Sequence, residues 1–150
     1  MRRIYFDNAA TTPIDKRVLR AIRPFLTKKY GNPSSVHKEG REAKKAIEKA
    51  REQVAKALNC LPCEIYFTSG ASESNATILN SGGYNLSSGD NHDSIELWEN
   101  VTTSRQRLNY FYPGINNETG DYGKITNPER YSFVHVDLTQ VVGKRDIDLS

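Results

Sequence analysis

Small and hydroxyl-bearing residues follow a short apolar run near the middle of the chain, in the stretch SGASESN at residues 69–75. The apolar run at residues 65–67 predicts a strand, and the stretch behind it predicts a glycine-containing turn and a helix that reaches Leu79. Backbone N–H groups at the start of such a helix, together with the hydroxyl of Ser72, can bind a phosphate. The same pattern suits a helix with Ser72 as its N-cap and no ligand, and this stretch alone favours that simpler interpretation.

A carboxylate and an amide follow a second β-rich run, in FVHVDLTQ at residues 133–140. Asp137 stands where the predicted strand ends, and ligands of open α/β sheets gather at the carboxyl ends of strands. A carboxylate there can hold a ring nitrogen protonated, as pyridoxal enzymes require, and Gln140 could reach a nearby oxygen. The alternative is that Asp137 only caps the following turn.

Two loop residues complete the set of candidates. A neutral imidazole at His92 can stack on a flat cofactor ring, and the amide of Asn117 can donate a hydrogen bond to a phenolate oxygen. Either residue can equally be an ordinary exposed loop residue, since asparagine is common in turns.

Cys60 and Cys63 form a lone C-x-x-C pair in NCLPCE. Structural zinc takes four ligands, and the chain has no second Cys or His pair at a suitable spacing. A redox pair normally lies at a helix start, whereas this pair follows a predicted helix. We therefore interpret both as incidental loop cysteines, with half a zinc site or a redox pair as the alternatives.

Hydrophobic periodicity predicts the elements that would position these residues. Apolar residues at helical spacing predict a helix over residues 15–26, with Asp15 as its N-cap. They also predict a longer helix from residue 36 or 42 to Leu58, capped by Ser34 or Ser35 and ended by Asn59 and Pro62.

The rest of the chain has weaker patterns. Residues 80–93 are rich in Gly, Ser and Asn and predict a loop. A short helix is expected at residues 94–101, and strands are expected at residues 108–112 and 131–137.

Composition limits the class of protein. The chain has 150 residues and a net charge of +3, which suits one domain and gives no argument for binding nucleic acid. No apolar run approaches the roughly 20 residues of a membrane span, and the start of the chain lacks the apolar region of a secretory signal. The sequence therefore predicts no membrane association and a cytoplasmic location.

Together, these segments resemble the N-terminal half of the cysteine desulfurases, which belong to the class-V aminotransferase family. The matching segments are YFDNAATTP, YGNPSSVHKEGREA, REQVAKAL, IYFTSGASESN, NNETG and HVDLTQVVGKRDIDLS. Residues 1–79 and 133–150 match closely, whereas residues 80–132 are shortened and loop-rich. We therefore interpret residues 1–150 as a single partial domain.

The resemblance implies an α/β protein of fold type I that uses pyridoxal 5'-phosphate (PLP) to take sulfur from L-cysteine, leaving alanine. The expected architecture is a truncated, incomplete three-layer α/β/α arrangement with N-terminal helices. The resemblance also assigns roles by position: the phosphate to Ala71 and Ser72, ring stacking to His92, the phenolic oxygen to Asn117 and Gln140, the ring nitrogen to Asp137, and the substrate-side loop to Asn8, Ala9 and Ala10.

Several departures from the family are expected to matter. The lysine that holds the cofactor covalently lies in a Ser-Gly-His-Lys motif that these 150 residues do not contain, and Lys124 and Lys144 lie in the wrong context to replace it. The family's catalytic cysteine is also absent. The strand expected before His92 is replaced by GGYNLSSGD, and Leu138 stands where the family has a small residue, so that it would press toward the cofactor ring.

The chain alone is therefore expected not to turn over cysteine, because covalent catalysis in this family needs both the lysine and the thiolate. Three interpretations stay open. The chain could be a desulfurase subunit that another chain completes, a non-catalytic partner of a full-length desulfurase or of a second copy of itself, or the product of a decayed gene.

Overall fold

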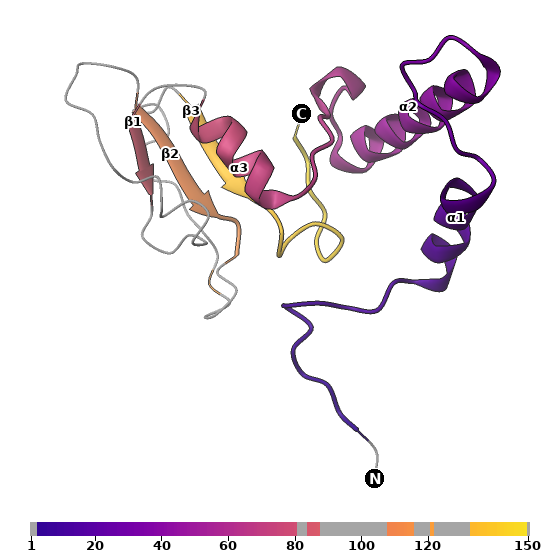
Figure 1. Ribbon diagram of the computed structural model, residues 1–150. Coiled ribbons are helices and arrows are strands. Elements are labelled where there is room, and N and C mark those ends of the chain that lie inside the picture. The colour runs from indigo at the N-terminus through magenta and orange to yellow at the C-terminus, as the bar shows by residue number, and fades with distance from the viewer. Residues whose placement is uncertain (1–2, 81–83, 88–107, 116–120, 122–132, 150) are drawn as a thin grey trace. The chain divides into compact units, whose positions relative to one another are not determined.

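The structure is a computed structural model that describes residues 3–80, 84–87, 108–115, 121 and 133–149 (Figure 1). It divides into two compact units. The first comprises Met1–Tyr66 with Ile147–Ser150, and the second comprises Phe67–Asp146. The first unit holds two long helices, and the second holds a small sheet and a shorter helix, so helix predominates over sheet.

Helix α1 spans Lys16–Thr27 and begins at the predicted cap. The side chain of Asp15 accepts a hydrogen bond from the backbone N–H of Arg17 at 2.7 Å. The predicted apolar stripe is present but exposed, with Leu26 74% exposed and Ile22 38% exposed. A helix of 12 residues is marginal by itself, so α1 depends on packing that the described residues do not supply.

Helix α2 spans Lys38–Leu58, and its predicted cap was wrong. The ring of His37, rather than Ser34 or Ser35, caps the helix, with Nδ1 accepting from the N–H of Gly40 at 3.4 Å. The helix begins at Lys38, so the capping position falls on His37, whereas Asn32 accepts from the N–H of Ser34 with its side chain and from the N–H of Ser35 with its carbonyl. These bonds commit both serines to a turn that precedes the helix.

The end of α2 agrees with the prediction. Asn59 adopts the left-handed conformation, with φ of 51°, and terminates the helix. The carbonyl of Leu58 accepts from the N–H of Leu149 at 3.0 Å, and the Asn59 amide donates to Asp148 at 2.8 Å. The last described residues of the chain are thereby attached to the C-terminal end of α2.

The strand predicted around residues 65–67 was wrong. Pro62–Glu64 forms a short 3₁₀ helix, η1, and residues 65–68 have no regular structure. The carbonyl of Ile65 accepts instead from the guanidinium of Arg51 on α2. An apolar run becomes a strand only where a neighbouring strand pairs with it, and no described strand pairs with this segment.

A three-stranded parallel sheet forms the second unit's framework. Strand β1 spans Tyr84–Ser87, β2 spans Leu108–Pro113 and β3 spans Phe133–Asp137, in the order β1-β2-β3. The predictions of β2 and β3 are confirmed. The prediction of an uninterrupted loop over residues 80–93, and of no strand before His92, was wrong, because β1 pairs along its whole length with β2.

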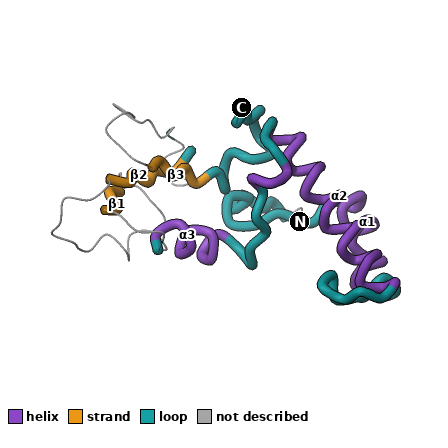
Figure 2. The backbone as a smooth tube through the Cα atoms, turned by 90° about the horizontal axis from the view of Figure 1, so that it is seen from above, coloured by secondary structure: helices purple, strands orange, loops and turns teal. Residues whose placement is uncertain are grey.

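Helix α3 spans Ala71–Leu79, as predicted, and lies on one side of the three strands (Figure 2). It carries the second unit's small core, Leu79, with Ile78 packed beside it. Sheet and helix make two layers of the expected three. The helix predicted at residues 94–101 lies outside the described residues, and none of the described helices could cross a membrane.

Candidate functional site

The turn into α3 is open at its first residues. Gly70 is the N-cap, with φ of 165° and no side-chain cap, so Ser72 lies inside the first turn and is not the N-cap. A Cβ added to Gly70 would meet no atom within 4 Å. Ala71 and Ser72 are exposed, and their N–H groups point out of the start of a helix, where positive potential collects.

Side chains within the turn hold it in shape without using Ser72. The Thr68 hydroxyl donates to the carbonyl of Gly70 at 3.1 Å and lies 2.8 Å from the Ser74 hydroxyl. The Glu73 carboxylate accepts from the N–H and hydroxyl of Ser69 at 2.6 and 2.5 Å, and the hydroxyl and N–H of Ser69 lower the pKa of Glu73.

The donors that remain form a compact set. Within the described ranges, the structure gives no hydrogen-bond acceptor to the N–H groups of Ala71 and Ser72 or to the Ser72 hydroxyl. Two amides and a hydroxyl at a helix start are a suitable donor set for a phosphate.

Asp137 ends β3, and one oxygen of its carboxylate binds the turn that follows the strand. Oδ1 accepts from the N–H of Thr139 at 2.9 Å and from its hydroxyl at 2.6 Å. Among the described residues, nothing donates to Oδ2. The predicted turn-capping role and the predicted ligand role are therefore compatible, because they use different oxygens.

The end of β2 closes against the loop that follows β3. The N–H of Gly114 donates to the Asp137 carbonyl at 2.7 Å. A Cβ on Gly114 would lie 3.0 Å from Leu138 Cδ2 and 2.9 Å from Val141 Cγ2. Leu138 thus packs over Gly114, at the end of the neighbouring strand.

Gln140 lies in the turn after Asp137, where its Oε1 accepts from the Lys144 ammonium at 2.8 Å. Asn8, Ala9 and Ala10 form an exposed turn in the first unit. His92 and Asn117 lie outside the described residues. Of the six predicted cofactor-binding residues, the second unit therefore shows four: Ala71, Ser72, Asp137 and Gln140.

A partly buried contact joins the two elements that carry these residues. Oδ1 of Asn75 on α3 lies 3.1 Å from Nε2 of His135 on β3. Asn75 is 3% exposed. Burial lowers the pKa of His135, an effect that the nearby Asp137 carboxylate partly opposes. The imidazole is thus neutral near pH 7 and donates from Nε2 to the amide oxygen.

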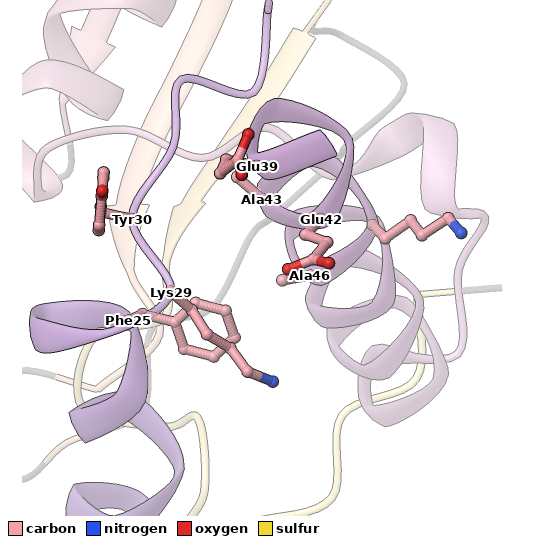
Figure 3. Close-up of a pocket in the computed structure, with 8 residues that line it drawn as sticks. Phe25, Lys29, Tyr30, Glu39, Glu42, Ala43 and Ala46 are labelled. Atoms are coloured by element: carbon pink, nitrogen blue, oxygen red, sulfur yellow. The ribbon is translucent and has the colours of Figure 1, made fainter. Parts of the chain in front are cut away.

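The first unit has a hollow of about 390 Å³ between α1 and α2 (Figure 3). The Lys29 ammonium lies 5.7 Å from the centre of the Phe25 ring there, and Glu39 and Glu42 also line the hollow. No predicted site residue lines this hollow. Cys60 and Cys63 are free thiols, and among the described residues no group of three or more His, Cys, Asp or Glu side chains could hold a metal ion.

Comparison with known proteins now identifies the family. A family model described as aminotransferase class-V matches residues 4–107. The chain belongs to the class-V aminotransferase family. The cysteine desulfurase IscS of Dictyoglomus turgidum is 50% identical over 91 residues, which cover 61% of this chain and 23% of that protein. The mitochondrial cysteine desulfurase of Drosophila melanogaster is 33% identical over 99% of this chain and 41% of its own length.

Solved structures of class-V relatives agree. A NifS-like protein superposes with a TM-score of 0.84 at 30% identity, over 99% of this chain and 52% of its own. A structure titled SspA in complex with cysteine superposes with a TM-score of 0.80 at 30% identity, over 96% of this chain and 53% of its own. The chain is a cysteine desulfurase homologue that spans about half the length of these solved relatives and less of the curated ones.

The class-V family uses PLP, and the donors and acceptors of the second unit suit both ends of that molecule. The open amides of Ala71 and Ser72 suit its phosphate, and the available oxygen of Asp137 suits a protonated ring nitrogen. Both groups belong to one compact unit.

Sequence reasoning missed the residues that support these groups. Thr139, Asn75 and His135 were not singled out, although the alternation of β3 places His135 two residues before Asp137. That spacing could have indicated a shared face of the sheet. No sequence pattern links Asn75 to a residue 60 positions away.

Proposed function

We propose that residues 1–150 form the cofactor-binding part of a cysteine desulfurase site and hold PLP without a covalent bond. The observation that carries this proposal is the pairing, in one compact unit, of an open helix start at Ser72 with the half-used carboxylate of Asp137. Homology to cysteine desulfurases supports PLP as the ligand and L-cysteine as the substrate.

Each residue has a defined part in this proposal. The N–H groups of Ala71 and Ser72 and the Ser72 hydroxyl donate to the phosphate oxygens. Asp137 Oδ2 accepts from the ring N–H and stabilises its positive charge, while Thr139 holds Oδ1 and fixes the plane of the carboxylate. PLP supplies an electron sink for bonds at the amino acid's α-carbon.

Turnover needs two groups that this sequence does not contain in the family's context. The Ser-Gly-His-Lys motif and the catalytic cysteine are absent from the 150 residues. We infer that a lysine and a thiolate from residues outside this sequence complete the site. We expect residues outside this sequence to supply the third layer of the parent α/β/α fold as well.

Association with another polypeptide is the second part of the proposal. The apolar stripe of α1 is exposed over Val18, Leu19, Ile22, Phe25 and Leu26. Such a stripe is normally buried against another surface. A second copy of this chain, or a full-length desulfurase, would cover it.

Equilibrium binding of PLP tests the proposed function. We expect saturable binding with one PLP per chain, followed by absorbance and by quenching of Trp98 fluorescence. Ser72→Ala should weaken binding by about tenfold or more, because it removes a hydrogen bond to a charged group. Thr77→Ala is the matched control, since its hydroxyl lies on the same helix and donates to the Glu73 carbonyl. Equal affinities for both variants would contradict the proposal.

A further inference from the structure

Among the described residues, Asn75 is the only polar residue that is buried. It is 3% exposed, and its Oδ1 faces His135 Nε2 at 3.1 Å. Burying an amide costs free energy unless it is hydrogen-bonded. An apolar side chain at this position would avoid that cost, so the amide calls for an explanation beyond packing.

The two partners stand next to the two proposed cofactor contacts. Asn75 lies three residues after Ser72 on α3, and residues at this spacing are neighbours on one side of a helix. His135 lies two residues before Asp137 on β3, and residues at this spacing point to the same face of a sheet. The contact therefore joins the helix that carries the phosphate donors to the strand that carries the carboxylate.

We propose that Asn75 and His135 form a positioning pair that fixes the separation between Ser72 and Asp137 for a ligand that contacts both. This inference rests on the proposed function and adds to it the residues that set the spacing. Neither residue is proposed to touch PLP. Their hydrogen bond acts through the elements that carry the contacting residues.

The consequence differs between long and short ligands. PLP is rigid between its ring nitrogen and the carbon that bears its phosphate arm, so it contacts both ends only when their separation is correct. Errors of about 1 Å in such positioning are costly. Inorganic phosphate contacts the Ser72 end alone, so its affinity should not depend on the spacing.

The direction of the hydrogen bond between Asn75 and His135 fixes the tautomer of the His135 ring, and this tautomer can be measured. Asn75 Oδ1 can only accept, so His135 must carry its proton on Nε2. Burial lowers the pKa of His135, so the ring stays neutral at pH 7. The ¹⁵N shifts of the imidazole report this tautomer without any ligand.

Two variants of His135 separate positioning from stability. His135→Leu replaces the imidazole donor with an apolar side chain. His135→Gln replaces it with an amide whose N–H can still donate. We expect His135→Leu to weaken PLP binding by about tenfold while the affinity for inorganic phosphate changes less than about twofold. His135→Gln should recover part of the loss. Phosphate affinity is read from the amide NMR signals of Ala71 and Ser72.

Asn75→Ala tests the same contact from the helix, should His135→Leu fail to fold. Alanine favours the helix, and the variant removes the amide whose oxygen accepts from His135. His37→Leu is the control, because that histidine belongs to the first unit and caps α2. It should leave both affinities unchanged.

Each contrary result has a distinct meaning. Equal losses of PLP and phosphate affinity would show a general structural role and overturn the positioning pair. Unchanged PLP affinity in both His135→Leu and Asn75→Ala would also overturn it, while leaving the proposed function intact. A parent chain that binds phosphate at Ser72 but does not bind PLP would contradict the proposed function itself, and the positioning role with it.

Discussion

Asp137 uses only one of its two carboxylate oxygens in the turn that follows β3, which leaves room for the proposed ligand role. The N–H and the hydroxyl of Thr139 both donate to Oδ1 of Asp137, and no described residue donates to Oδ2. The sequence raised the turn and the ligand as alternatives because it does not show which oxygen is used. The structure shows the turn role at Oδ1, and the ligand role at Oδ2 stays a prediction.

Thr139 should therefore support cofactor binding without touching the cofactor. Thr139→Val keeps the N–H bond to Asp137 and removes the hydroxyl bond, so the carboxylate should turn more freely. We expect PLP affinity to fall by about threefold to tenfold, in line with one hydrogen bond to a charged group. Titration by absorbance measures this, with Thr77→Val as the control. If Thr139→Val binds PLP as tightly as the parent, the hydroxyl of Thr139 does not support PLP binding.

His135 should make stability depend on pH. Burial lowers the pKa of His135 in the folded chain below the ordinary value of about 6.5, so folding favours the neutral ring. The stability that the neutral His135 ring contributes is fully present above about pH 6.5. It is lost as the pH falls through the lower pKa of the folded state.

Denaturant unfolding at several pH values measures this effect. We expect the free energy of unfolding to fall from pH 7 to pH 5, with a slope of at most about 1.4 kcal/mol per pH unit for one proton. His135→Gln should flatten the profile in this range. A parent profile as flat as that of the variant would show that the histidine is not buried as described.

At the scale of elements, local patterns predicted what local forces determine. Helices α1, α2 and α3 were found because their apolar spacing and their terminal residues, such as Asp15 and Asn59, act within a few positions. The strand prediction failed at residues 65–67 and missed β1, because a strand depends on a partner that is distant in sequence. The cap of α2 was missed because the helix begins at Lys38, so that the capping position falls on His37 and on neither serine.

The start of α2 offers a test of close packing. A Cβ on Gly40 would lie 2.3 Å from the carbonyl oxygen of Ser35 and 2.7 Å from that of Asn32, both of them backbone atoms. Gly40→Ala should destabilise the chain by about 1–3 kcal/mol, the usual cost of overpacking. Gly70→Ala is the control, because a Cβ added at Gly70 would meet no atom within 4 Å. Thermal unfolding compares the two, and equal melting temperatures would contradict the described turn.

At the scale of the whole molecule, many large apolar side chains of the described residues are exposed. Among the described residues, only Ala55 and Leu79 are buried hydrophobic side chains. The relatives extend well beyond the part that this chain matches. Family membership could be predicted from short motifs, whereas the small number of buried apolar side chains among the described residues became visible only in the structure.

The α1 stripe should make the chain associate. Leu26 is 74% exposed on that stripe, so Leu26→Glu places a charge where a partner surface would lie. We expect the parent to elute from a sizing column, with light scattering, as a larger species than the variant. Arg20→Glu is the control for added negative charge away from the stripe. A parent chain that stays monomeric at high concentration would argue against self-association.

Borohydride reduction of the PLP complex tests the central claim most directly. PLP is added to the purified chain, its absorbance is recorded before and after borohydride, and the protein is then mapped by mass spectrometry. We expect one PLP per chain, held by Ser72 and Asp137, and no stoichiometric adduct on any lysine. A stoichiometric adduct on one lysine, or the absence of saturable binding, would contradict the account.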